Sequence, residues 1–182
     1  KRGHRRQPGA TGPVDDLPTL WRYLSSGTAD PLGRPLALLS FLLDGRDWPT
    51  EPFPFLRTNL VLHLGMGLLL WRLLATLGAT LEGEASQRTR LSAALAAGLW
   101  LLHPLLVSTT LYVVQREAML PSAFVLLGLL GFLAGRRRYQ QGDRRSGAVV
   151  GAGSIVVCTG LAMLCKANGV LLPLLALVVD SC

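Results

Sequence analysis

Long apolar segments alternate with short polar ones along most of this chain. Stretches with few or no charges cover residues 56–77, 91–106, 118–134 and 148–165, and a fifth apolar run begins near Gly169. A helix needs about 20 apolar residues to cross a hydrocarbon core about 30 Å thick. The pattern therefore predicts an all-α fold: a polytopic transmembrane helix bundle of about four complete spans and a truncated fifth.

The segment before the first apolar run has a different pattern. Residues 14–55 mix six acidic residues and three arginines with short apolar stretches. "LPTLWRYLSS" and "RPLALLSFLLDG" each fit one to three turns of an amphipathic helix. The second stretch has a proline in its opening turn and closes near Gly45, as helix punctuation predicts. We expect a short basic tail, 1–13, to be disordered because it is rich in Gly and Pro. Residues 14–55 would then form an external loop, and residues 56–182 the transmembrane bundle.

Composition and charge agree with a membrane protein. Half of the residues are apolar, 16% are charged and the mean hydropathy is +0.40, whereas a soluble domain carries about 25% charged residues. The net charge of +7 does not indicate nucleic acid, since no basic module with interleaved aromatics appears. Loops rich in Lys and Arg mark the cytoplasmic side, and residues 136–147 carry five arginines. Counting from that loop places 14–55, 107–117 and 166–169 outside.

The two ends of the chain predict a fragment. The sequence starts without Met and stops inside an apolar run, so we expect a larger protein. Its basic tail precedes an external segment with no span between them, which a missing first transmembrane helix would explain.

The three cysteines form no CxxC or Cys/His spacing. No cofactor is therefore predicted, and a need for a divalent metal is left open.

Polar groups from four separate segments fall at the predicted external face. Charged groups close to hydrocarbon are costly and are usually functional or paired. Each also has a simpler interpretation: an aspartate before "LPTLW" can cap a helix, His-Pro can end a span, and interfacial Arg and Lys can snorkel. Asn59 and His63 are four residues apart and should share a face that looks into the bundle. The candidate residues are Asp15, Asp16, Arg34, His103, Gln115, Arg116 and Lys166.

Five motifs occur along the chain in a fixed order: "VDDLPTL", "GRPLALLSFLLD", "NLVLHLGMGLLLWRLL", "LWLLHPLLVSTTLYVVQREAMLPSAFVLLGLLGFLAGR" and "MLCKANGVLLPLLALVVD". Together they resemble bacterial polytopic membrane proteins of the GT-C glycosyltransferase type. The sequence is similar to the transmembrane O-mannosyltransferases that carry tetratricopeptide repeats, and more distantly to protein O-mannosyltransferases. The resemblance covers about residues 14–180, and the His-Pro…Tyr-Val-Val-Gln-Arg block is its most specific part.

The resemblance implies a glycosyltransferase of the bacterial inner (cytoplasmic) membrane. Such an enzyme would transfer a sugar from a polyprenyl-phosphate donor to a protein or glycan hydroxyl at the periplasmic face. The family's catalytic acidic pair maps onto Asp15 and Asp16, and a carboxylate can take the proton of the acceptor hydroxyl. The lipid phosphate requires positive partners. Residues expected to bind substrate or phosphate are Arg34, His103, Gln115, Arg116 and Lys166.

One departure from the family pattern leaves other functions open. The family's Lys-Glu-Asn-Gly reads Lys-Ala-Asn-Gly here, with Ala167 in place of the glutamate. This change favours a non-catalytic membrane anchor or scaffold for a tetratricopeptide-repeat protein. A third hypothesis is a ligase or polymerase of lipid-linked oligosaccharides, which relies on arginine and histidine instead of an acidic pair. We expect the fragment alone to be inactive.

Overall fold

The computed structural model describes residues 14–27, 31–45, 51–83 and 86–181, and every regular element within them is helical. This confirms the predicted all-α class. The predicted disordered tail, 1–13, lies outside the described residues. The elements are α1 (Leu17–Leu24), α2 (Pro35–Leu42), α3 (Phe53–Glu82), α4 (Gln87–Leu102), α5 (Pro104–Thr110), η1 (Val113–Gln115), α6 (Arg116–Gln140), α7 (Arg144–Cys165), η2 (Ala167–Leu171) and α8 (Leu172–Asp180).

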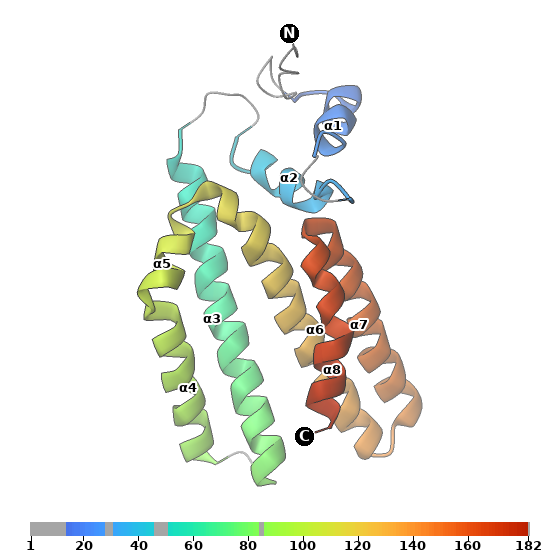
Figure 1. Ribbon diagram of the computed structural model, residues 1–182. Helices are drawn as coiled ribbons and strands as arrows, with labels where there is room; N and C mark the ends of the chain where they lie inside the picture. The colour runs from blue at the N-terminus through green and yellow to red at the C-terminus, as the bar shows by residue number, and fades with distance from the viewer. Residues whose placement is uncertain (1–13, 28–30, 46–50, 84–85, 182) are drawn as a thin grey trace.

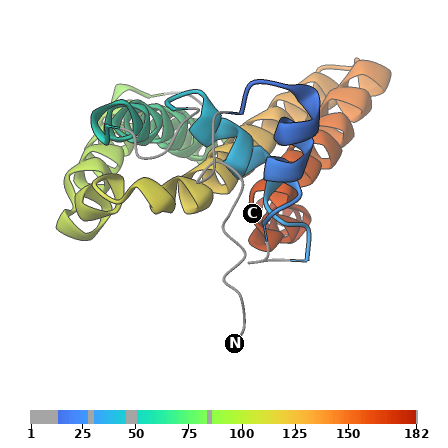
Figure 2. The ribbon, with the colours of Figure 1, turned by 90° about the horizontal axis from the view of Figure 1, so that it is seen from above.

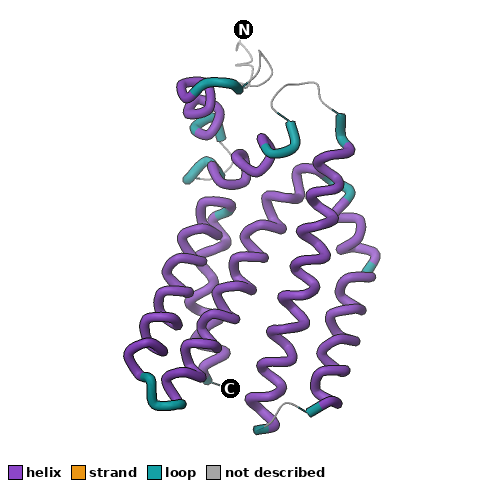
Figure 3. The backbone as a smooth tube through the Cα atoms, turned by 180° about the vertical axis from the view of Figure 1, so that it is seen from behind, coloured by secondary structure: helices purple, strands orange, loops and turns teal. Residues whose placement is uncertain are grey.

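The long helices stand side by side, and the two short N-terminal helices lie over one end of them (Figure 1). α3 packs against α4 and α6, while α6 and α7 form a helical hairpin on which α8 lies. Seen from above, α2 crosses the end of the bundle (Figure 2). We call the end of the bundle that α1 and α2 cover the capped end. The opposite end holds the short turn between α6 and α7, visible from behind in Figure 3, and we call it the arginine end.

Three helical segments are long and apolar enough to cross a membrane: Phe53–Glu82, Val113–Gln140 and Arg144–Cys165. α4 and α5 pass the same test together, although they are bent by 60° at the break between them. The number of candidate spans in the described residues is therefore three or four, which is consistent with an integral membrane protein. The fifth apolar run forms a shorter helical stretch, Ala167–Asp180.

The surface of α3 shows the arrangement expected in lipid. Leu60, Leu64 and Leu68 form a stripe along its outer side and are each at least half exposed. Asn59 and His63 lie on another side of α3 and are buried, which confirms that they look into the bundle. A water-soluble helix has the reverse pattern, with the polar face outside.

Close packing of α6 on α7 depends on small residues. A Cβ atom at Gly135 would lie 2.4 Å from the backbone nitrogen of Gly151, and one at Gly147 would lie 2.5 Å from the nitrogen of Tyr139. Small residues spaced four apart allow two membrane helices to approach through their backbones. The hairpin thus owes its tight spacing to Gly135, Gly147 and Gly151.

Short helices form at both predicted stretches, but α2, with the sequence PLALLSFL, is apolar at nearly every position and is not amphipathic. α1 begins after Asp16 and has proline in its first turn. α2 begins on Pro35 and ends at Leu42, just before Gly45. Proline suits the first turn because its missing N–H would have no partner there.

Candidate functional site at the capped end

The His-Pro pair marks a break in the fourth helix. α4 ends at Leu102, α5 begins at Pro104, and their axes differ by 60°. A break of this kind frees backbone carbonyls, which are costly to leave unpaired in hydrocarbon. The carbonyl of Leu101 is paired by His63, whose Nε2 lies 3.0 Å from it. Donation to a carbonyl requires the proton on Nε2 of this ring. His103 itself is exposed.

Asn59 pairs the carbonyls at the far end of the broken segment. Its side chain is fully buried. Its Nδ2 donates to the carbonyls of Thr110 at 3.3 Å and Tyr112 at 3.1 Å, where α5 has ended and its last carbonyls have no partner within the helix. The Oδ1 of Asn59 accepts a hydrogen bond of 2.9 Å from Nε of Arg116.

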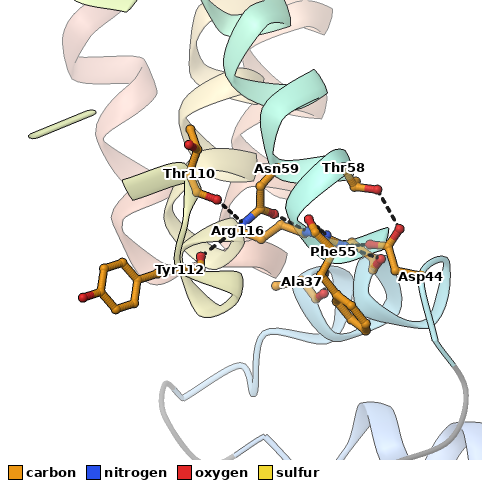
Figure 4. Close-up of polar contacts among 9 residues, drawn as sticks. Ala37, Asp44, Phe55, Thr58, Asn59, Thr110, Tyr112 and Arg116 are labelled. Atoms are coloured by element: carbon orange, nitrogen blue, oxygen red, sulfur yellow. Dashed lines mark hydrogen bonds and ion pairs between the residues drawn. The ribbon is translucent and has the colours of Figure 1, made fainter. Parts of the chain in front are cut away.

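Arg116 is the centre of the polar network at the capped end (Figure 4). Its side chain has no exposed surface, and all three of its nitrogens are engaged. Beyond the bond to Asn59, it donates to the carbonyl of Phe55 at 2.9 Å and to that of Ser40 at 2.8 Å. The same guanidinium lies 5.0 Å from the ring centre of Phe41. A role toward a phosphate would therefore require this network to open.

Asp44 supplies the countercharge. Its carboxylate lies 2.5 Å from the guanidinium of Arg116, and its other oxygen accepts a hydrogen bond of 2.6 Å from Thr58. Two buried opposite charges stabilise a fold little in net terms, but removing one of them costs about 3–5 kcal/mol because the other is left unpaired. The pair therefore ties α2 to α3 and α6.

A second ion pair also joins α2 to α6. Arg34, the residue before α2, pairs with Glu117 in the first turn of α6. Arg34 has a φ of 55°, a left-handed conformation that residues with a side chain rarely adopt. Tyr23 of α1 is buried nearby, and burial raises the pKa of its phenol, with the charge of Glu117 raising that pKa further.

The acidic pair lies at the start of α1. Asp16 is the N-cap: it accepts a hydrogen bond of 3.1 Å from the N–H of Thr19, and the Thr19 hydroxyl contacts the same carboxylate. These bonds lower the pKa of the Asp16 carboxyl. Asp15 is exposed. The capping interpretation is thus confirmed for Asp16, and both Asp15 and Asp16 are exposed to solvent.

Lys166 and Asn168 line a cavity of about 450 Å³ between α3 and α4 on one side and α6, η2 and α8 on the other. The rest of its lining is mainly apolar and includes Met66, Trp100, Pro121, Leu126 and Leu175. Lys166 follows α7 directly and so lies at the capped end. The cavity therefore combines a mainly apolar lining with one positively charged side chain.

The structure brings the predicted residues to one part of the bundle but not into one cluster. Within the described residues, no hydrogen bond or ion pair links Asp15, Arg116 and Lys166 to one another, and Gln115 is exposed. The candidate site residues chosen from the sequence did not include Asp44 or Glu117. The signal available was Arg116 itself, because a charge inside an apolar sequence requires a countercharge.

In the part of the chain that is described, no three His, Cys, Asp or Glu side chains are grouped to hold a metal ion.

The fold and this site define a class: a helical protein with candidate membrane spans and a polar network at one end. No protein-family model matches the chain, and no curated protein or solved structure matches it. The resemblance to GT-C glycosyltransferases thus stays a prediction.

Proposed function

We propose that the chain belongs to a membrane glycosyltransferase that moves a sugar from a polyprenyl-phosphate donor to a protein or glycan hydroxyl. The observation that carries this proposal is the mainly apolar cavity that Lys166 helps to line. A polyprenyl phosphate joins a long apolar chain to one anionic head group. A mainly apolar cavity with a cation in its lining suits both parts of such a molecule.

The carboxylates at the start of α1 act as the base that takes the proton of the acceptor hydroxyl. The acceptor hydroxyl gives its proton to a carboxylate while its oxygen bonds to the anomeric carbon of the sugar. The bond from that carbon to the phosphate oxygen breaks, and the electron pair leaves with the phosphate. Asp15 is the better base, since Asp16 accepts the hydrogen bonds that cap α1.

The leaving phosphate gains negative charge in this step, and a fixed positive charge stabilises it. Lys166 supplies that charge, and Asn168 beside it offers an amide for hydrogen bonding to phosphate or sugar. With the arginine end in the cytoplasm, the capped end and its carboxylates face the periplasm of a bacterial inner membrane.

Binding of the lipid tests the cavity directly. Polyprenyl monophosphate is titrated against the protein in nanodiscs, with polyprenol, which lacks the phosphate, as the matched ligand. We expect the phosphate to bind more tightly than the alcohol, and Lys166→Met to remove most of that preference. Arg145→Met is the control because Arg145 is an exposed cation at the arginine end.

Equal binding of polyprenol and its phosphate would contradict the assignment of Lys166. Absence of any binding would favour the membrane scaffold over the enzyme. Transfer that persists in the double variant Asp15→Ala with Asp16→Ala would instead favour a ligase or polymerase that needs no acidic pair.

A further inference from the structure

Two neighbouring residues at the start of α6 pair with opposite ends of α2. Arg34 immediately precedes α2 and pairs with Glu117. Asp44 follows the end of α2 and pairs with Arg116. The charges alternate in sign on both partners, so only one direction of α2 across α6 satisfies both pairs.

α2 packs against α7 as well as α6, and the two ion pairs add to these contacts. It has eight residues, and isolated helices of that length are unstable in water. Its first turn has no side-chain cap. Ala37 and Phe41 are its buried residues, whereas Leu39 and Leu43 point outward. A small apolar contact of this kind defines a direction poorly, and the two ion pairs define it well.

The same contacts extend to α1. α1 packs against α2, and buried Tyr23 lies close enough to Glu117 for the carboxylate to affect its phenol. Asp15 and Asp16 open α1. The position of the acidic pair over the bundle is therefore set through α2.

We propose that Arg116 and Glu117 are positioning residues that form a two-ended clamp on α2, and that this clamp holds the acidic pair at the capped end. The consequence for sugar transfer rests on the proposed function, whereas the clamp itself does not. Under this proposal the charged side chains of Arg116 and Glu117 face α2 of the same chain. Arg34 and Arg116 then act on substrate only through the position of α1.

A charge swap separates the clamp from a direct role in phosphate binding. Arg34 and Glu117 are the pair to exchange because each side chain is 18% exposed and tolerates reversal better than the buried pair. The variants are Arg34→Glu, Glu117→Arg and the double swap, all made in the full-length protein and placed in nanodiscs. Arg57→Glu is the control, since Arg57 is an exposed arginine near the same end of α3.

Hydrogen exchange of the α2 amides reports local opening. We expect each single reversal to speed this exchange about tenfold or more, and the double swap to return it to within about threefold of wild type. Arg57→Glu should leave it unchanged. Glu117→Gln removes the charge without reversing it, so it gives a milder opening if a reversed variant fails to fold.

Sugar transfer measured on the same samples completes the test. Rescue of both exchange and transfer by the double swap is the expected result. Exchange that stays fast in the double swap would overturn the clamp. Restored exchange without restored transfer would overturn the positioning role and assign Arg34 to the substrate. A wild-type protein without transfer would contradict the proposed function, and the exchange data would still decide the clamp.

Discussion

Asn59 shows how one side chain can satisfy three hydrogen-bonding partners. It bonds the carbonyls of Thr110 and Tyr112 and accepts from Arg116. A leucine of similar size would leave those carbonyls and one guanidinium N–H without a partner. Unpaired buried polar groups each cost about 1–3 kcal/mol.

We therefore expect Asn59→Leu to lower the free energy of unfolding by about 2–4 kcal/mol. Denaturant titration in detergent, followed by circular dichroism, measures this change. Leu60→Ala on the outer face of α3 is the control and should cost less than about 1 kcal/mol. Equal losses in the two variants would mean that the network contributes nothing particular.

The Asp16 carboxylate makes the stability of α1 depend on pH. Its pKa in the folded chain is lowered from 3.8, chiefly by the bond from the Thr19 side chain. A lowered folded pKa means that the carboxylate stabilises α1 above the unfolded pKa. This stabilisation is lost as pH falls below about 3.8 through the folded value.

The α1 amides should accordingly exchange faster below that pH in wild type. Asp16→Asn still caps a helix but does not titrate, so its α1 exchange should follow only the intrinsic pH dependence of exchange. The comparison is made on intrinsic-corrected rates. An identical acid-induced opening in the asparagine variant would assign the effect to another group.

At the scale of the helices, the α6–α7 hairpin depends on glycines that admit no Cβ. An alanine at Gly135 would place its Cβ 2.4 Å from the Gly151 nitrogen, and the helices would have to separate. We expect Gly135→Ala to lower the unfolding free energy by about 1–3 kcal/mol. Gly153→Ala is the control, because no atom lies within 4 Å of its Cβ position. Alanine there should be neutral or stabilising, by up to about 1 kcal/mol, and a loss as large as at Gly135 would contradict this packing.

Helix positions were predictable because local signals set them. Proline and Gly45 delimit α2, and the four-residue spacing of Asn59 and His63 puts both on one inner face. The partners of these side chains were not predictable. Asp44 and Arg116 are separated by 72 positions in sequence, counted as 116 minus 44, and only the packing of α2 on α6 brings them together.

The His-Pro pair marks the end of α4, as the sequence predicts, but a histidine on another helix contacts the backbone carbonyl at this break. His103 is exposed, while His63 on α3 contacts the Leu101 carbonyl. Spacing along one helix cannot show which neighbouring helix lies opposite its broken turn. That relation depends on how α3 and α4 pack, which is a property of the whole bundle.

For the whole molecule, the arginines predict its orientation in the membrane. Arg137, Arg138, Arg144 and Arg145 are exposed around one turn, and such clusters stay on the cytoplasmic side. Single cysteines at Gln141 and Tyr112, in a background without the three native cysteines, report the two ends. A membrane-impermeant maleimide on intact cells should label Tyr112→Cys and spare Gln141→Cys until the membrane is opened. The reverse labelling would contradict the assigned orientation.

The central claim is sugar transfer from a polyprenyl-phosphate donor with Asp15 as base, and a transfer assay tests it most directly. Membranes containing the full-length protein, as wild type, as Asp15→Asn or as the control Glu51→Gln, an exposed carboxylate before α3, are given radiolabelled polyprenyl-phosphate hexoses. We predict label in protein or glycan with wild type and Glu51→Gln, and a loss of about 100-fold or more with Asp15→Asn. Wild-type membranes that transfer no more label than membranes lacking the protein would contradict the account.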